Sequence, residues 1–551
     1  MYAGVAVATA LFMVHTVGFA LDDSYITYRY AKHLELGYGL VFNVGEHYLG
    51  TTAPGFAILL ALTHRLIDLL HIPALLAAVS GQEIGRVTIL LDIPHLARYL
   101  TAIGVAAIGV LCYGFVTRAF LNPVARVVGG LGTLWIMTLP RLAGVTGHET
   151  LPYTALVLLG LYLWRTHLAA ASFVLGCASV VRPDAAIAFV IAAALTGIGW
   201  LARGRRFHYE VLRLLPFLIP TLAWAVFAWI YYGSPIPGTL LAKRAQLVFN
   251  VFPVTSVDIL SGSVFSAVPS AIQVIVLLCA VAGFLIAVLQ NDSFAFVGLW
   301  GLGHLAAYST LNVSFWSWYA APLVVVYVLC CVYGMAGIVS LLWALRDRRG
   351  TTLALTFEVR PGVAPSAPLR EPEPVKAQVA VSWYACAVVV AVPLALILLC
   401  TMGLGIRAGW KEITGPKRIH LHTYSFIEVA DYLHREAPSG ASLGTAEPGA
   451  LAYFLGPNYY VVDLLGLTNP GVAQHLLDRD FEWSYLHYRP DYLLMSFSAL
   501  PDKPWFKESY ALIAEFHHPY WTAQGLTLKL FRRHADALKS AERTRLERPS
   551  V

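Results

Sequence analysis

Two adjacent carboxylates, Asp22-Asp23, stand where the first apolar run of the chain ends. A half-desolvated carboxylate has a raised pKa and can act as a general base that takes a proton from a hydroxyl. The pair could equally hold a divalent cation through its oxygens, or one acid could cap a helix over 24–36. A helix cap accounts for one acid and leaves the second without a role.

Four further segments place charged or aromatic residues at the ends of apolar runs. They are His148-Glu149, Arg182-Pro183-Asp184, Lys243-Arg244 and Trp316-Ser317-Trp318-Tyr319. Cations can stabilise negative charge that develops on a phosphate, and charges at membrane depth are usually functional because they are costly. Each segment also has a simpler interpretation: a loop pair, a salt-bridged helix break, a site for lipid headgroups, or an interfacial aromatic belt.

The composition indicates that these segments belong to a membrane protein. Of the 551 residues, 58% are hydrophobic and 13% are charged, and the mean hydropathy is +0.65. So few charges cannot cover the surface of a soluble protein of this length, in which about 25% of residues are charged. The net charge of +6 is too dilute to indicate nucleic-acid binding. All seven cysteines lie within apolar runs, without the spacing of a metal site.

Apolar runs of roughly 20 residues predict eleven membrane-spanning helices. They lie at 1–21, 97–117, 124–143, 150–166, 168–181, 184–202, 211–231, 269–290, 294–311, 318–344 and 379–405. The run at 53–72 is also apolar but contains His64, Arg65 and Asp68, so we expect a helix at the membrane interface there. It would belong to a long first extracytoplasmic loop, 22–96.

The basic residues predict the orientation of these spans. Arginines gather at 118–126, 203–213 and 346–349, which are inner loops if the N-terminus is cytoplasmic. This orientation places Asp22-Asp23 and the four other segments together on the extracytoplasmic side of a multi-pass protein of the plasma (inner) membrane.

The remaining segments divide the chain into a membrane module, 1–405, and a C-terminal domain. Residues 345–378 hold five prolines and predict a disordered cytoplasmic linker inside the module. Residues 406–535 predict an extracytoplasmic α/β domain, with a helix near 426–435 and strands near 459–462 and 492–495. The tail, 536–551, is charged.

The chain has no nucleotide-binding motif, and an enzyme outside the cytoplasm has no nucleotide sugar available. A sugar carried on a polyprenyl phosphate in the membrane would meet that need. A carboxylate would then deprotonate an acceptor hydroxyl, which attacks the anomeric carbon while polyprenyl phosphate leaves. Cations would stabilise the leaving phosphate, and aromatic residues would stack on the sugar.

The sequence resembles GT-C-fold membrane glycosyltransferases, and most closely the actinobacterial terminal β-(1→2)-arabinofuranosyltransferases. The resemblance rests on the following motifs: Asp22-Asp23, Tyr28-Arg29-Tyr30-Ala31, Gly37-Tyr38-Gly39, Asn43 with Gly45-Glu46, Gly147-His148-Glu149, Arg182-Pro183-Asp184, Pro237-Gly238-Thr239 with Ala242-Lys243, 447–453 and 463–467. The chain departs from the family at His47-Tyr48-Leu49-Gly50-Thr51, which lacks a second acid, and at Gly238, where the family has asparagine.

The resemblance implies a GT-C protein with about eleven transmembrane helices and an inverting transfer, with arabinofuranose as the leading sugar. It implies Asp23 or Asp22 as the base, and these two as ligands if a divalent cation is used. We expect four cations to bind the donor phosphate: Arg29, Arg182, Lys243 and Arg244. We expect eight residues to bind substrate: Asn43, Glu46, Thr51, His148, Glu149, Asp184, Trp318 and Tyr319.

We expect the partners to be a polyprenyl-phosphate sugar donor, a cell-envelope glycan acceptor and membrane lipids. A lipid or protein acceptor is an alternative within the same chemistry. A transporter or flippase is a second alternative, although it predicts charges at the membrane midplane and inverted repeats, and no repeat is visible. A third is a non-enzymatic envelope assembly protein that acts through its C-terminal domain.

Overall fold

The structure is a computed structural model that describes residues 21–137, 139, 142, 144–202, 211–248, 270–311, 313, 316–349, 352–359, 375–382, 418–495, 503–522 and 524–534. Nearly all of the predicted spans at 1–21 and 379–405, and the whole tail at 536–551, lie outside these residues.

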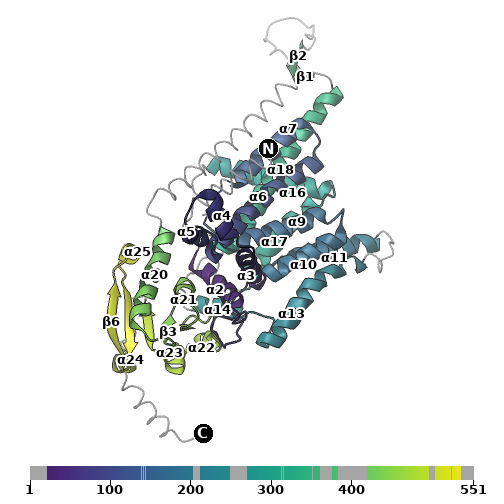
Figure 1. Ribbon diagram of the computed structural model, residues 1–551. Coiled ribbons are helices and arrows are strands. Elements are labelled where there is room, and N and C mark those ends of the chain that lie inside the picture. The colour runs from purple at the N-terminus through teal and green to yellow at the C-terminus, as the bar shows by residue number, and fades with distance from the viewer. Residues whose placement is uncertain are drawn as a thin grey trace, which may run out of the picture.

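Each of the nine predicted spans that the described residues cover is a helix, which confirms the helical assignments. They are α6 (Ile93–Ala119), α7 (Pro123–Met137), α9 (Thr150–Leu163), α10 (Leu168–Val181), α11 (Ala185–Ala202), α13 (Leu218–Tyr232), α16 (Ser270–Leu289), α17 (Phe294–Thr310) and α18 (Ser317–Arg349). Helix α16 packs along α18, α6 packs on α7 and α9, and α10 packs on α9 (Figure 1). These helices form the body of the membrane module.

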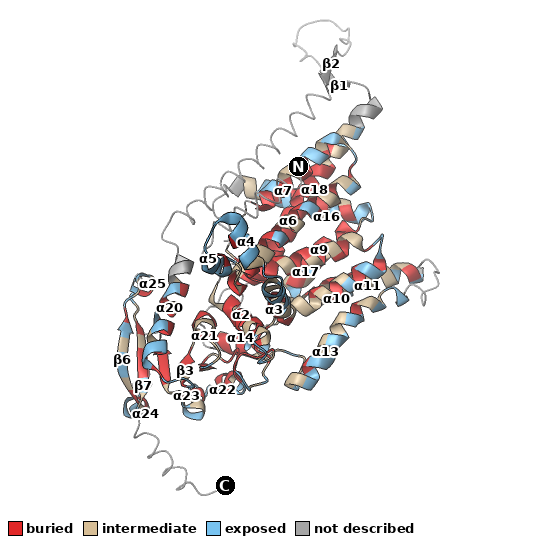
Figure 2. Cartoon of the chain, viewed as in Figure 1, coloured by how far each residue is buried: buried red, intermediate tan, exposed pale blue. Residues whose placement is uncertain are grey.

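Length and composition support membrane crossing for part of this set. Among the described residues, four helices are long and apolar enough to cross a membrane, within 93–119, 215–232, 272–289 and 317–344. Apolar side chains on their outer faces are exposed, such as Ile219 and Ile230 of α13, as lipid contact requires (Figure 2). The total of eleven spans stays a prediction.

The first loop folds into four helices: α2 (Asp22–Glu35), α3 (Pro54–Leu69), α4 (Ile72–Ser80) and α5 (Ile84–Leu90). Helix α3 lies within 53–72, where the sequence predicts a helix. Helices α3 and α4 are bent by 60° and could together form a broken span or a re-entrant loop, by length and composition. Their depth in the membrane therefore stays a prediction.

The C-terminal domain is an α/β domain, as predicted. Its sheet has the order β4 (Tyr460–Asp463), β3 (Ser442–Thr445), β5 (Tyr492–Met495), β7 (Leu528–Arg533) and β6 (Tyr510–Phe516). The first three strands are parallel, and β7 and β6 add to them in antiparallel fashion. The helices of the domain are α20 (Arg418–Glu436), α21 (Gly449–Leu455), α22 (Val472–Leu477), α23 (Trp483–Tyr488), α24 (Pro504–Ser509) and α25 (Pro519–Thr522).

The C-terminal domain shares a hydrophobic core with the first loop. Tyr25 of α2 and Phe56 and Leu60 of α3 belong to one buried cluster with Phe426 of α20 and Leu451 of α21. Helix α2 packs against both α3 and α21 (Figure 1). Because burial of apolar area stabilises at about 25 cal/mol per Å², this shared core holds the domain against the helix that carries Asp22 and Asp23.

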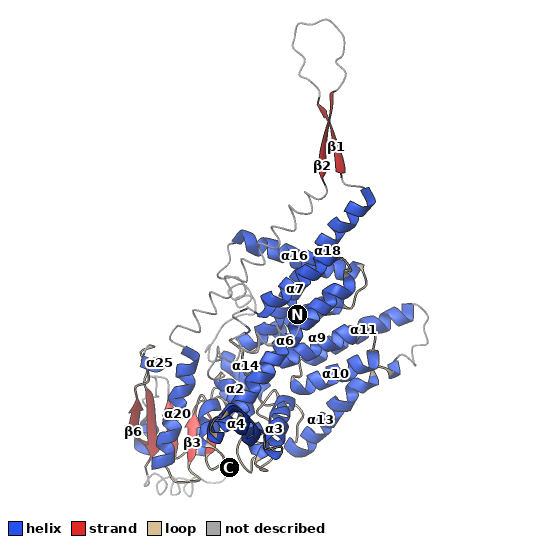
Figure 3. Cartoon of the chain, turned by 45° about the horizontal axis from the view of Figure 1, so that its top comes forward, coloured by secondary structure: helices blue, strands red, loops and turns tan. Residues whose placement is uncertain are grey.

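The expectation of a disordered linker at 345–378 is wrong for its two flanks. Strands β1 (Thr352–Val359) and β2 (Val375–Ser382) pair in antiparallel register, and the hairpin extends from the end of α18 away from the other helices (Figure 3). Strand β1 contains two threonines, a phenylalanine and a valine, and β2 contains three valines, all of which favour extended backbone. The five prolines that suggested disorder all lie between the strands, at 361–374.

Candidate functional site

Asp22 and Asp23 occupy the first turn of α2 but contact different parts of the molecule. The residue at the N-cap of α2 is Leu21, and no side chain caps that helix. The expectation that one acid caps the helix following it is therefore wrong. The two carboxylates are instead used in contacts between segments far apart in the sequence.

The Asp22 carboxylate binds the N-terminus of α21 in the C-terminal domain. Its oxygens accept hydrogen bonds from the backbone N–H groups of Gly449, at 3.2 Å, and Ala450, at 2.7 Å. The first amides of a helix have no partner within the helix and favour a negative charge. A Cβ at position 449 would collide with the backbone oxygen of Asp22, so the close approach requires glycine.

Two residues of the C-terminal domain add to this contact. His422 Nε2 lies 2.5 Å from Glu447 Oε2, and both residues lie close enough to Asp22 to affect its titration. Burial and the nearby Glu447 raise the pKa of Asp22 from 3.8 to about 7. Burial lowers the pKa of His422, but the hydrogen bond to Glu447 and the negative charges of Glu447, Asp22 and Asp23 together outweigh burial and raise that pKa.

Asp23 pairs with a cation on another helix. Lys243 lies on α14 (Thr239–Val248), and its Nζ is 3.4 Å from Asp23 Oδ2. The Asp23 side chain is 31% exposed and that of Lys243 only 9%. The ammonium lies 5.0 Å from the ring centre of Trp316 and 5.7 Å from that of Trp318. An accessible carboxylate, a nearly buried cation and two stacked indoles thus share one location.

A buried acid–base chain begins at Trp318. The ring of His148 stacks on Trp318, with ring centres 5.4 Å apart, and His148 Nδ1 lies 3.0 Å from Glu149 Oε2. The other oxygen of Glu149 accepts a hydrogen bond from Arg182 Nη1 at 2.6 Å. His148, Glu149 and Arg182 are all buried, so the charges of Glu149 and Arg182 are compensated by one another rather than by water.

This buried acid–base chain of side chains continues through Arg182 to Asp184. Arg182 Nε donates to Asp184 Oδ1 at 3.1 Å, and Tyr308 donates to Asp184 Oδ2 at 3.0 Å. The guanidinium also lies 5.5 Å from the ring centre of Tyr319. His304 is fully buried, with Nδ1 4.0 Å from Asp184. The two ends of the Arg-Pro-Asp motif thus bind one another while Arg182 also holds Glu149.

Local contacts hold the loop that carries His148 and Glu149. Tyr28 of α2 donates to the Gly147 carbonyl at 2.6 Å, and the Gly147 N–H donates to the Thr101 hydroxyl at 3.1 Å. Gly147 has a φ of +86°. Glycine adopts this left-handed conformation readily because glycine has no Cβ. The loop is therefore fixed to α2 and α6 immediately before the acid–base chain begins.

Arg29, Asn43 and Glu46 lie at the junction with the C-terminal domain. Arg29 is buried and donates to the backbone carbonyls of Phe42, Ala452 and Tyr459. Asn43 both donates to the Val461 carbonyl and accepts from the Val461 N–H, each at 2.9 Å, along the edge strand β4. Glu46 accepts from Tyr460 at 3.1 Å and from Asn43 at 3.1 Å.

Thr51 and Arg244 make separate contacts. The Thr51 hydroxyl lies 3.0 Å from that of Thr27 and accepts from the Ala53 N–H, so it fixes the entry into α3. Arg244 is the neighbour of Lys243 but is exposed, and its Nε donates to the Leu311 carbonyl at 3.4 Å. Neither residue makes a contact with Asp23 in the described structure.

The segment 47–51 and Gly238 meet in space. A Cβ at Gly238 would collide with the phenol hydroxyl of Tyr48, and the Gly238 N–H donates to the Leu49 carbonyl at 3.0 Å. Tyr48 thus lies against the position that an asparagine side chain at 238 would need. The residue types at positions 48 and 238 are therefore sterically coupled, which neither segment reveals by itself.

Sequence reasoning missed His422 and His304 and gave no site role to Glu447, Trp316 or Tyr308. Glu447 and Tyr308 contribute through contacts between helices or domains, for which spacing along the chain carries no signal. The sequence indicates Trp316 only as part of an aromatic segment.

The described residues that could bind a metal ion together do not include the Asp22-Asp23 pair. Among the described residues, one group of three potential ligands comes together, at Glu35, His64 and Asp68, and neither Asp22 nor Asp23 belongs to it.

Comparison with known proteins places the fold. Two solved structures are similar over nearly the whole chain: ArnT from Cupriavidus metallidurans bound to undecaprenyl phosphate, and the same protein in the apo state. Each has a TM-score of 0.51 and 12% identity, covering 97% of this chain and 98% of ArnT. The chain is therefore a multi-pass membrane protein with an ArnT-like GT-C fold, which confirms the predicted fold class.

Sequence comparison adds one match. A family model described as a domain of unknown function (DUF8728) matches residues 412–535, which is the C-terminal domain. No curated protein matches the chain in sequence.

Proposed function

We propose that the protein transfers a sugar from a polyprenyl phosphate to a hydroxyl of a cell-envelope glycan, on the extracytoplasmic side of the membrane. The ArnT-like fold supports the class of reaction, because one of the similar ArnT structures is bound to undecaprenyl phosphate. The motifs of the first loop favour arabinofuranose as the sugar. A lipid or protein hydroxyl as acceptor would require the same chemistry.

The observation that carries this proposal is the pairing of Asp23 with Lys243 beside Trp316 and Trp318. A general base must be reachable by the acceptor hydroxyl, and a leaving phosphate needs a positive charge nearby. Indole faces are suited to stack on a sugar ring. Asp23, Lys243 and the two tryptophans supply these three elements from three separate segments.

Asp23 is the base in this proposal, and Asp22 is a positioning residue. Both oxygens of Asp22 accept hydrogen bonds from the amides that begin α21. Because both oxygens already accept hydrogen bonds from the amides of Gly449 and Ala450, Asp22 offers an acceptor hydroxyl little access. Asp23 instead has one ion pair, at 3.4 Å, and a side chain that is 31% exposed.

The reaction transfers one proton and exchanges one bond. Asp23 takes the proton of the acceptor hydroxyl, whose oxygen forms a bond to the anomeric carbon from the face opposite the phosphate. The bond between that carbon and the phosphate oxygen breaks, and its electron pair leaves with polyprenyl phosphate. The configuration at the carbon is inverted. Lys243, released from Asp23 by the competing phosphate, stabilises the leaving group.

The buried chain of His148, Glu149, Arg182 and Asp184 supports this centre. Its charges compensate one another, so it gives Trp318 and Tyr319 a rigid backing rather than a second free cation. We propose that His148 and the two aromatic residues contact the sugar, while Glu149, Arg182 and Asp184 hold them in place.

Arg244, which is exposed next to Lys243, is proposed as a secondary contact for the phosphate. Arg29, Asn43, Glu46 and Thr51 act in this proposal through the domain junction or the entry into α3 rather than on the sugar. Their hydrogen bonds are directed to backbone carbonyls, to strand β4 and its neighbours, and to Thr27.

The decisive experiment incubates the purified full-length protein with a panel of polyprenyl-phosphate sugars and an arabinan or other envelope glycan acceptor. We expect one donor to be consumed, with a glycosylated product of inverted configuration. Asp23→Asn should lower the turnover by roughly 10²–10⁴-fold, the contribution typical of a general base. Asp431→Asn, an exposed acid on α20, is the matched control and should keep full activity.

Two outcomes would reject the proposal. Full activity of Asp23→Asn would show that Asp23 is not the base. If the folded protein consumed no donor of the panel, the proposed class of reaction would be wrong. If the protein moved the intact donor across the membrane of proteoliposomes without transferring its sugar, that result would instead support a flippase. Deletion of 406–551 is a poor test of an assembly role, because it would expose the apolar faces of α2 and α3.

A further inference from the structure

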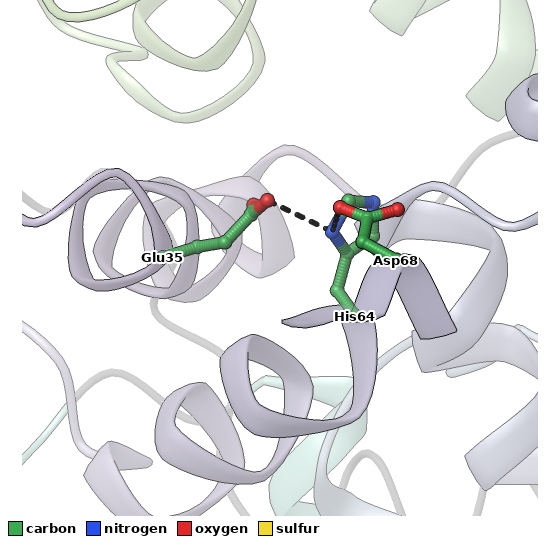
Figure 4. Close-up of side chains that lie close together, drawn as sticks. All are labelled: Glu35, His64 and Asp68. Atoms are coloured by element: carbon green, nitrogen blue, oxygen red, sulfur yellow. Dashed lines mark ion pairs between the residues drawn. The ribbon is translucent and has the colours of Figure 1, made fainter. Parts of the chain in front are cut away.

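Three side chains that commonly bind metal ions meet where α2 ends against α3 (Figure 4). Glu35 is the last residue of α2, and His64 and Asp68 lie one turn apart on the same face of α3. His64 Nδ1 lies 3.0 Å from Glu35 Oε1 and 3.5 Å from Asp68 Oδ2. One ligand atom from each residue lies within 4.8 Å of the other two.

The burial of the group distinguishes it from a surface ion pair. The side chain of Glu35 is 7% exposed and that of His64 is 12% exposed, whereas that of Asp68 is 43% exposed. His64 Nδ1 is itself buried and makes no hydrogen bond within the described residues, although it is directed at two carboxylates. A buried ring nitrogen without a hydrogen bond leaves its lone pair to be satisfied by another partner.

We propose that Glu35, His64 and Asp68 bind a divalent transition-metal ion, with Zn²⁺ as the best fit. Bonds of about 2.0–2.2 Å from zinc to nitrogen and oxygen separate tetrahedral ligand atoms by about 3.4 Å. The two separations from His64 Nδ1, 3.0 Å and 3.5 Å, bracket that value. An imidazole with two carboxylates suits zinc better than Mg²⁺ or Ca²⁺, which prefer oxygen ligands alone.

The group is open to solvent on one side, at Asp68. Asp68 is the exposed member of the group, so the ion would reach the site from that side and keep a water molecule there. Lys32 contacts Glu35 through the second oxygen, Oε2, at 2.9 Å, which leaves Oε1 for the ion. A protonated His64 held by the two carboxylates is the competing interpretation, and it predicts no affinity for metal.

The ion would join α2 to α3 and not take part in transfer. Asp22 and Asp23 lie at the opposite end of α2, which is 14 residues long and therefore about 20 Å in length. The site would fix the far end of the helix that carries them. This inference does not depend on the proposed function, and metal binding can be measured without any donor or acceptor.

The test is a metal titration of the full-length protein in nanodiscs after treatment with a chelator. We expect isothermal titration with Zn²⁺ to show one site per chain that is absent from His64→Gln. Replacement of Zn²⁺ by Co²⁺ should give visible absorption bands of a low-symmetry site with nitrogen and oxygen ligands. Mg²⁺ and Ca²⁺ should not compete at similar concentrations.

Two variants keep the test falsifiable. Asp68→Asn alters the most exposed ligand and is the least disruptive to folding, and we expect it to weaken Zn²⁺ binding at least about tenfold. His95→Gln is the matched control, because His95 pairs with Asp92 at 2.5 Å on α6 without belonging to a three-ligand group among the described residues. Equal Zn²⁺ affinity and stoichiometry in the wild type, His64→Gln and Asp68→Asn would overturn the proposal.

Discussion

The carboxylate of Asp22 lies 2.7 Å from the backbone nitrogen of Ala450, across 428 residues of sequence. The first turn of α2 is thereby held by the first turn of α21 in another domain. Asp23, the next residue, faces Lys243 instead. One helix start therefore presents one carboxylate to the domain junction and the other to the proposed site of transfer.

Loss of the Asp22 carboxylate should weaken the docking of the C-terminal domain. Asp22→Ala leaves the N–H groups of Gly449 and Ala450 without their acceptor, and removal of a helix cap typically costs about 0.5–2 kcal/mol. We expect a lower thermal midpoint and faster proteolysis between the two domains. Asp431→Asn is the control, and an unchanged midpoint in Asp22→Ala would contradict this prediction.

Stability should fall as the pH rises through neutrality. The pKa of Asp22 is raised to about 7 in the folded protein, and the pKa of His422 is raised as well. Both groups hold their protons more tightly when folded, so their stabilisation is complete below the unfolded pKa and is lost as the pH passes the folded pKa. The thermal midpoint should therefore decline between about pH 4 and pH 8.

The assignment of this pH dependence can be checked with one variant. Asp22→Asn cannot titrate, so its midpoint should change less with pH than that of the wild type over the same range. Asp431→Asn should keep the slope of the wild type. Parallel slopes in the wild type and Asp22→Asn would assign the dependence to other groups.

Asn43→Asp should loosen the edge of the sheet at the domain junction. The aspartate can still accept from the Val461 N–H but cannot donate to the Val461 carbonyl, and it places a second carboxylate beside Glu46. A buried acceptor left without a donor costs about 1–3 kcal/mol. Thermal unfolding should reveal the loss, whereas Asn458→Asp, at an exposed position, should have little effect.

Lys243 and Arg244 should differ in their contribution to transfer. Lys243→Met removes the cation beside Asp23 and should lower kcat by roughly 10²–10³-fold, as loss of one group that stabilises developing charge does. Arg244→Met removes an exposed cation and should act mainly on the KM for the donor. Steady-state kinetics with the donor identified by the panel will separate the two effects. A larger loss of kcat in Arg244→Met would reverse the assignment.

Much of the fold could be predicted because membrane helices depend on composition within one segment. Nine expected spans, the α/β domain and the strand at 492–495 correspond to elements of the structure. The linker was mispredicted because its prolines are confined to 361–374, while the residues on either side form β1 and β2. Proline content averaged over the segment concealed this division.

The candidate site divides in the same way. The sequence by itself determined which residues are unusual, because charged and aromatic residues at the ends of apolar runs are rare and costly. Only the tertiary structure decided their partners. Asp22 binds α21, Asp23 faces Lys243, and Arg29 joins the C-terminal domain, although all three begin as charges on one short helix. The direction of a side chain and the element packed against it depend on contacts between distant segments, and local sequence does not encode those contacts.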